Sequence, residues 1–195
     1  TIANVTFYNN TATQMGGAIY VHSGSPQLTN VGIYSNSAGL NGGGIYNEVT
    51  YDGIGGRIAI TGSAFYSNTA GLFGGGLYNN AGSPQLSNVL FQGHSAKLAG
   101  SAIYLSKGSA TIVDTQFIGN YGASWGSGLY NKENSVVLRG VTFSGSQATY
   151  GGSIFNSEAS VTIENLSLIS STAKYNGGGI LNDKSFITIT NAAIA

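Results

Sequence analysis

Apolar residues recur along the chain at an interval of about 26 residues, each inside a short segment in which apolar and small or polar residues alternate. Alternation of this kind is typical of β-strands with one buried face. Alignment of the segments produces three apolar columns, so each interval predicts three short strands. The columns contain Ile19, Ile45, Leu77, Ile103, Leu129, Ile154 and Ile180; Phe7, Ile33, Phe65, Phe91, Phe117, Phe143 and Leu168; and Leu28, Ile60, Leu86, Ile112, Leu138 and Ile163.

A glycine-rich motif precedes the first of these columns in every unit. Its seven copies, which include GGAIY from Gly16 and GGGIYN from Gly42, begin 26, 32, 26, 26, 25 and 26 residues apart. Units that repeat in this way stack on their neighbours instead of each closing a core alone. Crossovers between parallel strands are nearly always right-handed. We therefore expect an all-β fold, a right-handed parallel β-helix of about seven coils and about 35 Å in length.

The whole chain, residues 1–195, is predicted to be a single β-helix domain. The 32-residue interval contains six extra residues, which we place in a loop insertion at about residues 48–57. Insertions in repeat proteins fall in loops on one face and often carry binding functions. Both ends of the chain fall inside ordinary repeat units without a polar cap, which favours a segment of a longer solenoid.

Asparagine recurs at fixed places between the alternating segments. It tolerates a left-handed backbone, and its side-chain amide can bond the equivalent amide one coil away. We interpret these residues as structural corners of the solenoid and not as ligands for a partner. They are Asn30, Asn36, Asn47, Asn68, Asn79, Asn88, Asn120, Asn131, Asn156 and Asn182.

Charged residues are scarce, and seven basic residues balance seven acidic ones. This balance provides neither the basic surface that nucleic acid requires nor a polybasic patch for an anionic membrane. No apolar run is long enough for a membrane helix, so we expect no direct membrane insertion. The chain contains no cysteine, which excludes disulfides and thiolate metal sites. Weak charge repulsion favours self-association, either lateral or end to end.

Parallel β-helices also support polysaccharide-degrading enzymes, so clustered carboxylates deserve a test. Glu133, Glu158 and Asp183 share one phase of the repeat, with Lys132 and Lys184 beside them. We interpret this column as a solvated corner, with a weak cation site as the alternative. His22 and His94 stand in different phases of the repeat. The sequence therefore predicts no catalytic residue, no metal site and no cofactor.

An aromatic residue directly follows the first apolar column in six units, where strand alternation turns it outward. The residue before the apolar position is always Gly, Ala or Ser, which predicts an aromatic row beside a shallow strip without side chains. Such a row suits sugar rings or an apolar partner, although stacking that stabilises the sheet is the simpler explanation. The candidate binding residues are Tyr20, Tyr46, Tyr78, Tyr104, Tyr130 and Phe155.

Two alternating motifs resemble the GGAI and FxxN repeats of the chlamydial polymorphic outer membrane proteins and similar bacterial surface β-helices. GGAI itself stands at residues 16–19, and FxxN stands at residues 7–10, 65–68 and 117–120. Looser copies cover essentially the whole chain. The resemblance implies an autotransporter-like, secreted passenger β-helix that is displayed at the bacterial cell surface and is often adhesive.

Two functions from different classes follow. The first is a non-enzymatic extracellular protein, either an adhesin passenger or a subunit of a surface fibre or matrix. Its partners would be further copies of itself, or a protein or glycan of a host or cell surface. The alternative is a carbohydrate-binding or polysaccharide-degrading module that uses the aromatic row and the insertion at residues 48–57.

Overall fold

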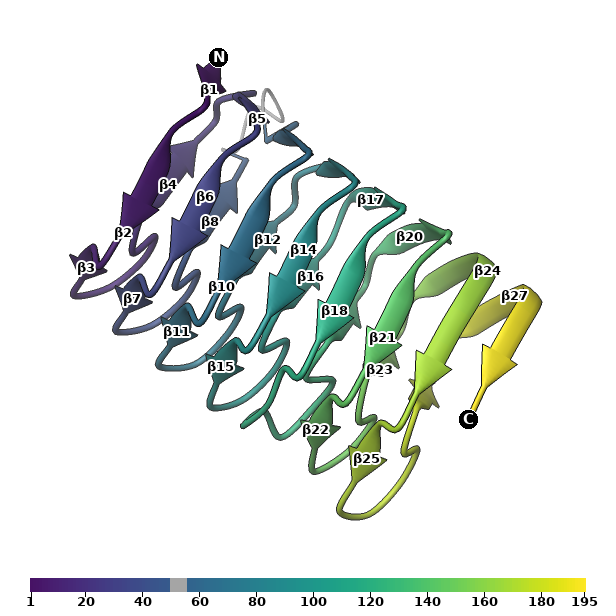
Figure 1. Cartoon of the computed structure of the whole chain (residues 1–195). Coiled ribbons are helices and arrows are strands. Elements are labelled where there is room, and N and C mark those ends of the chain that lie inside the picture. The colour runs from purple at the N-terminus through teal and green to yellow at the C-terminus, as the bar shows by residue number, and fades with distance from the viewer. Residues whose placement is uncertain (50–55) are drawn as a thin grey trace.

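The computed structural model describes residues 1–49 and 56–195. The chain winds into a parallel β-solenoid of stacked coils, with about 26 residues from one coil to the next (Figure 1). The described residues contain strands and turns but no helix, and hence no helix able to cross a membrane. The all-β parallel solenoid with three main strands per coil confirms the predicted fold class. The insertion predicted at residues 48–57 lies mostly outside the described residues.

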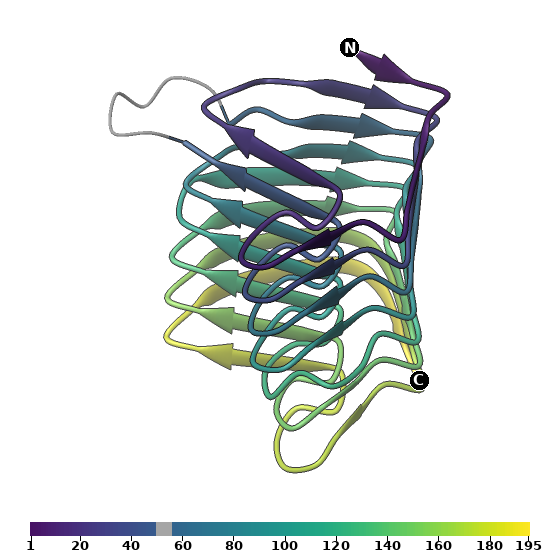
Figure 2. The same ribbon diagram turned by 90° about the vertical axis from the view of Figure 1, so that its left-hand side faces the viewer.

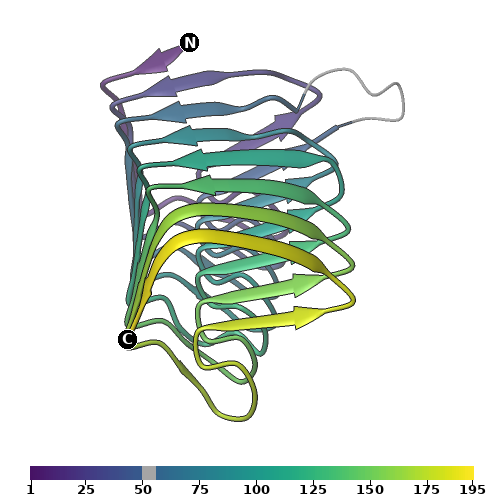
Figure 3. The same ribbon diagram turned by 90° about the vertical axis from the view of Figure 1, so that its right-hand side faces the viewer.

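The first two strands of each coil belong to one 14-stranded sheet that is bent into two faces. The first face contains β1 (Ile2–Ala3), β5 (Gln27–Thr29), β9 (Ala59–Thr61), β13 (Gln85–Ser87), β17 (Ser109–Val113) and β20 (Ser135–Arg139). The second face contains β2 (Thr6–Tyr8), β6 (Gly32–Tyr34), β10 (Ala64–Tyr66), β14 (Leu90–Gln92), β18 (Gln116–Ile118) and β21 (Thr142–Ser144). Figure 3 shows how β24 (Ser160–Ile169) and β27 (Phe186–Ile194) curve from the first face into the second without a break.

A seven-stranded sheet forms the third face of the solenoid. It contains β4 (Ile19–His22), β8 (Ile45–Glu48), β12 (Leu77–Asn80), β16 (Ile103–Ser106), β19 (Leu129–Lys132), β23 (Ile154–Ser157) and β26 (Ile180–Asp183). Short strands of two residues stand between the second and third faces, which the sequence did not predict. They are β3 (Thr11–Ala12), β7 (Ser37–Ala38), β11 (Thr69–Ala70), β15 (Ser95–Ala96), β22 (Gln147–Ala148) and β25 (Thr172–Ala173).

The three predicted apolar columns are in register in the structure. Phe65 pairs with Ile33 on one side and Phe91 on the other, and Leu77 is likewise paired with Ile45 and Ile103. Equivalent strands consequently form straight rows, as Figure 2 shows. Side chains of similar shape fill the narrow interior without changing from coil to coil, and most of them are fully buried. Burial of these columns is the main source of stability.

The glycine motif is part of this close packing. Gly42, Gly43 and Gly44 are all buried, and a Cβ on Gly43 would lie 2.3 Å from the Thr69 carbonyl oxygen of the next coil. Gly42 has a φ of 67°, which places it in the left-handed region that favours glycine. The glycines thus allow neighbouring coils to approach each other. They do not form the exposed strip without side chains that the sequence predicts.

Candidate functional site

The aromatic row on the third face is a continuous stack, which we call the aromatic ladder. Its members come from β4, β8, β12, β16, β19 and β23, whose backbones are in register. Successive ring centroids are 5.1, 4.9, 4.9, 5.0 and 5.4 Å apart, and the interplanar angles range from 3° to 24°. Such offset stacks stabilise a sheet beyond the area that they bury.

Most of the aromatic ladder is covered in the structure. The exposed fraction is only 5% for Tyr46, 7% for Tyr104 and 9% for Phe155, whereas Tyr20 is 47% exposed. Part of the cover comes from Phe73, whose ring lies 4.8 Å from that of Tyr104. Strand alternation therefore predicted the direction of these side chains but not their burial. A ligand that stacks on an open ring can reach Tyr20 more readily than the middle of the ladder.

Glu48 joins two coils at the exposed end of the aromatic ladder. Its carboxylate accepts hydrogen bonds from the Tyr20 hydroxyl and, at 3.1 Å, from the Tyr46 hydroxyl, and it contacts His22 Nδ1 at 2.8 Å. Burial alone would raise the pKa of Glu48, but the bonds from Tyr20, His22 and Tyr46 outweigh it and lower the pKa. The hydrogen bond to Glu48 in turn raises the pKa of Tyr20 to about 12.

The sequence itself contains a signal for this cluster. His22 and Glu48 are 26 residues apart and are paired across β4 and β8, just as Tyr20 and Tyr46 are. A carboxylate one repeat after a histidine and beside two stacked tyrosines predicts a contact once the register is known. Chemically, the cluster offers one ionised carboxylate with its partners in place. It holds the coils together and presents a single exposed imidazole, with 60% of the His22 side chain exposed.

Asparagine amides form a ladder inside the second bend of the first five coils, which we call the inner column; Ser146 and Ser171 take this place in the last two coils. It contains Asn10, Asn36, Asn68, His94 and Asn120. Asn68 Oδ1 accepts bonds from the Asn36 backbone N–H at 2.8 Å and from Asn36 Nδ2 at 3.0 Å, and Asn68 Nδ2 donates to the Ile33 carbonyl at 2.7 Å. Each amide thus ties its own coil to the preceding coil. Asn36, Asn68 and Asn120 are fully buried, so these bonds are made away from water.

His94 replaces asparagine in the inner column. The Asn68 backbone N–H donates to His94 Nδ1 at 3.0 Å, and the His94 backbone N–H donates to Asn120 Oδ1 at 3.0 Å. Because Nδ1 accepts a hydrogen bond, it is the nitrogen without a proton. Complete burial lowers the pKa of His94 to about 3. His94 is therefore a neutral structural residue, and it lies almost three repeats further along the chain than His22.

A second asparagine set lies inside the strands of the third face. Asn47, Asn79, Asn131 and Asn156 are buried residues of β8, β12, β19 and β23, and none of them has a positive φ. The sequence predicts that these asparagines are corners, and this is wrong: they lie inside strands, and the next turn begins one or two residues later. Asn47 Nδ2 donates to Asn79 Oδ1 at 2.6 Å, and Asn156 Nδ2 donates to Asn182 Oδ1 at 2.7 Å. Leu105 and Asn131 lie between the two pairs.

A third set of asparagines, the outer column, marks the bend between the first and second faces. Every residue at this bend has a positive φ, from 47° to 61°, and most of their side chains are exposed. Asn30 Nδ2 donates to Asn4 Oδ1 at 2.7 Å, and Asn191 Nδ2 donates to Asn165 Oδ1 at 3.2 Å. The column contains Asn4, Asn30, Gly62, Asn88, Asp114, Gly140, Asn165 and Asn191.

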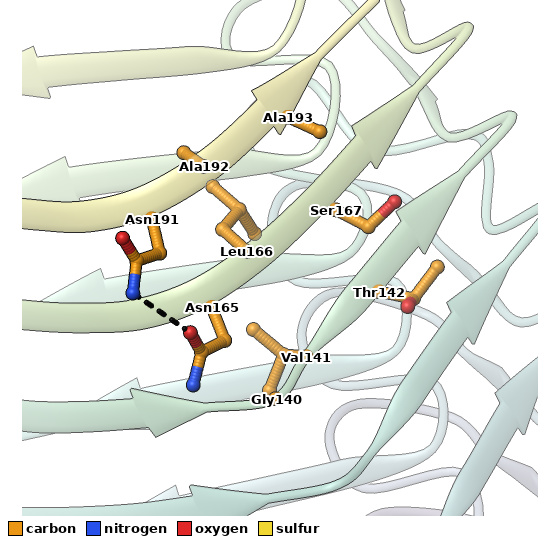
Figure 4. A pocket seen from close by; sticks show the side chains of 9 residues that line it. All are labelled: Gly140, Val141, Thr142, Asn165, Leu166, Ser167, Asn191, Ala192 and Ala193. Carbon is orange, nitrogen blue, oxygen red and sulfur yellow. Dashed lines mark hydrogen bonds between the residues drawn. The ribbon is translucent and has the colours of Figure 1, made fainter.

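Shallow hollows accompany the outer column at both ends of the solenoid. Figure 4 shows the one near the C-terminus, of about 440 Å³, where the Asn165–Asn191 amide pair lies beside Leu166, Ser167 and Thr142. A hollow of about 270 Å³ near the N-terminus includes Asn30 and Tyr34. None of the residues that line either hollow is charged. Their chemistry is that of neutral amides and hydroxyls on an open surface.

Of the acidic column predicted from the sequence, Glu133 and Glu158 lie on the turns after the third face. Asp183 is one residue out of phase, because it is the last residue of β26 and pairs with Ser157. Glu133 and Glu158 both have positive φ values, and each faces a lysine, with Lys132 Nζ at 3.5 Å from Glu133 and Lys184 Nζ at 3.5 Å from Glu158. All of these side chains are substantially exposed. Within residues 1–49 and 56–195, no group of three or more His, Cys, Asp or Glu side chains is placed to hold a metal ion. The column is a set of solvated ion pairs at this corner.

Comparison with known proteins yields one family. Residues 4–22 match the model of the Chlamydia polymorphic membrane protein repeat. This segment runs from the outer column through β2 and the first GGAI motif to β4, which is most of one coil. Together with the solenoid fold, the match makes the chain similar to a polymorphic membrane protein repeat, as its motifs suggest. No curated protein and no solved structure matches the chain.

Proposed function

We propose that this chain is a non-enzymatic structural or adhesive β-helix displayed at the surface of a bacterial cell. One observation carries the proposal: a segment that matches the polymorphic membrane protein repeat forms most of one coil of a regular solenoid, and the following coils repeat its strands in register. Such a rod extends outward and presents long, nearly uncharged faces to its surroundings. Its role is to bridge distance and to make contacts with other molecules.

The interior of the solenoid supports a mechanical role. Each coil is joined to the next by backbone ladders on three faces and by buried apolar columns, and the first five coils are also joined by the inner column. Stability in such a stack is a sum of contacts between neighbours, so the rod remains stiff along its whole length. A stiff rod without disulfides suits display outside the cell.

Surface display is tested with antibodies raised against the purified chain. We expect them to label intact cells of the bacterium that encodes it, and we expect external protease to remove the label. Antibodies to a cytoplasmic protein serve as the control for cell integrity. Labelling that appears only after the cells are permeabilised would overturn the surface location.

The non-enzymatic role is tested by incubating the chain with a panel of polysaccharides and analysing the products by chromatography. We expect no cleavage. Glu48→Gln is the informative variant, because Glu48 is the partly buried carboxylate that lies beside an exposed aromatic ring. Products that form with the native chain and disappear with Glu48→Gln would establish polysaccharide degradation instead.

A further inference from the structure

A row of apolar side chains, some exposed and the others half-buried, follows the turns between the short strands and the third face. These turns lie along one edge of the solenoid, after β7, β11, β15, β22 and β25 and at the equivalent residues 121–126, and they form the lower edge in Figure 1. We call this row the edge strip. It includes most of the large apolar side chains that the described coils expose away from the chain ends. Its members are Leu40, Leu72, Phe73, Leu98, Tyr121, Trp125, Tyr150 and Tyr175.

The edge strip is straight because its backbone is in register. Parallel bridges join Asn41 to Phe73, Phe73 to Ala99, Ala99 to Trp125 and Trp125 to Tyr150. The spacing along the strip is therefore that of the coils, about 4.8 Å. A partner with the same repeat can follow the strip from end to end, whereas a partner without a repeat can contact only part of it.

The two halves of the edge strip differ in chemistry. The half toward the N-terminus is mainly aliphatic, and its leucines come from three successive coils, with Leu40 38% exposed. The half toward the C-terminus is aromatic, with exposed fractions of 51% for Tyr121, 37% for Trp125 and 58% for Tyr175. Aromatic residues, above all Trp and Tyr, are the usual anchors of protein interfaces.

The charges on the edge strip are few and of one sign. The six turn segments from residues 37–42 to residues 172–177 contain Lys97 and Lys174 but no acidic residue. Lys174 Nζ lies over the ring of the adjacent residue, Tyr175, at 5.1 Å from the ring centroid. Depletion of charge is the compositional mark of the buried centre of an interface. The net charge of zero adds no long-range repulsion between two copies.

We propose that the edge strip is a dimer interface, on which a second copy of this chain packs antiparallel about a two-fold axis. The two-fold axis places the aromatic half of each copy on the aliphatic half of the other, so one complementary contact forms twice. Tyr175 of one copy then meets Leu40 of the other. Trp125 meets Leu98. A parallel pairing would instead set the two Trp125 side chains against each other and Lys174 against Lys174.

The dimer deepens the proposed surface function, on which its biological meaning rests, because paired rods form a thicker stalk or the unit of a matrix. The strip is two side chains wide and about 30 Å long. This size is below the roughly 800 Å² per partner of a stable interface. We therefore expect a weak dimer that assembles where the chains are concentrated.

Sedimentation velocity over a concentration series tests the pairing, and the fluorescence of Trp125, the only tryptophan in the chain, reports burial of the strip. The native chain should change from monomer to dimer as concentration rises, while the emission of Trp125 shifts to shorter wavelength. Leu40→Lys brings a lysine to the partner's Lys174, and Tyr175→Glu brings a carboxylate to the partner's Leu40. Each variant alone should weaken dimerisation at least tenfold, about 1.4 kcal/mol.

An equimolar mixture of the two variants distinguishes antiparallel from parallel pairing of the two copies. In an antiparallel pair the mixed dimer joins the new lysine to the new glutamate and keeps one native contact, so dimerisation should return. Ile169→Lys is the matched control, because Ile169 is 41% exposed on the second face and should leave the dimer unchanged. Circular dichroism checks that every variant retains its β-structure.

Three results would overturn the proposal. The native chain could remain monomeric at all concentrations, the single variants could dimerise as well as the native chain, or the mixture could fail to recover. A strip that binds immobilised glycans or lipid vesicles while the chain stays monomeric belongs to the first case. Surface labelling of intact cells is measured separately, so failure of the dimer and failure of the surface function remain distinguishable.

Discussion

The inner and outer columns use the same amino acid for different purposes. In the inner column the amide of Asn68 makes hydrogen bonds to the neighbouring coil and is completely buried. In the outer column Asn88 is exposed, and its distinguishing property is a φ of 54°. Inside, the side chain is required because it pairs polar groups that water cannot reach. Outside, the left-handed backbone is required, and the side chain faces solvent.

The substitutions that the chain itself contains support this contrast. The outer column includes Gly62 and Gly140, which adopt a left-handed backbone without any side chain. The inner column instead accepts His94, which offers an acceptor nitrogen at the same place. His94 and the two glycines thus each preserve the requirement of their own column. The contrast predicts which asparagines the fold can lose.

Removal of an inner amide should have the largest effect. Asn68→Leu leaves the Asn36 backbone N–H, Asn36 Nδ2 and the Ile33 carbonyl without their bonds inside the solenoid. We expect a loss of about 3 kcal/mol or more in the free energy of unfolding, because each buried group without a partner costs about 1–3 kcal/mol. Urea denaturation followed by circular dichroism measures it. A loss no greater than that of an outer-column variant would contradict the contrast.

Acid should destabilise the inner column through His94. The pKa is 6.5 in the unfolded chain and about 3 in the folded one, so between these values the unfolded chain binds the extra proton. The contribution of neutral His94 to the free energy of unfolding is therefore fully present above pH 6.5 and decreases as the pH falls toward 3. His94→Asn restores the amide and removes this titration. The native chain should lose stability relative to the variant by up to about 1.4 kcal/mol per pH unit.

Parallel pH profiles of the two proteins measure the difference, because the other titrating groups, including Glu48, are common to both. A constant difference in stability between pH 7 and pH 4 would show that His94 is not a buried neutral residue.

An amide without partners should behave in the opposite way to Asn68. Asn131 belongs to the second asparagine set, inside the strands of the third face, and is fully buried beside Leu105. Neither its Oδ1 nor its Nδ2 has a hydrogen-bond partner. Asn131→Leu should therefore raise the free energy of unfolding by about 1 kcal/mol, because it replaces an unpaired polar group with an apolar one. Asn47→Leu is the matched variant. It removes bonds to Asn79 and Gly56 and should destabilise the chain, and equal effects in both would refute the distinction.

Changes in the outer column should have the smallest effects. Asn88→Gly keeps the left-handed backbone available and should alter stability by no more than a few tenths of a kcal/mol. Asn88→Ala should cost about 1 kcal/mol, because a Cβ without a local hydrogen bond disfavours this conformation. Thermal unfolding of the two variants side by side resolves the difference. If alanine were tolerated as well as glycine, the backbone would not be the requirement.

The sequence predicted the parts of the molecule that repeat. The three apolar columns, the number of coils and the parallel strands follow from the interval alone, and the register pairs Phe91 with Phe117 and Ile103 with Leu129 as the alignment predicts. The sequence could not show how far the aromatic ladder is covered, because Phe73 reaches Tyr104 from a turn whose path depends on the neighbouring coil. It also missed the edge strip, whose members stand outside the strongly alternating segments.

The sequence by itself thus determined a solenoid, because a column of like side chains can be buried only when equal units stack in register. It also indicated where asparagine recurs. Only the tertiary structure decided which asparagines are inside: Asn68 and Asn88 look alike in the repeat, but one lies in a closed bend and the other on an open bend. The reason is physical, since a side chain's exposure depends on the direction of the backbone at its bend and on what the adjacent coils place over it.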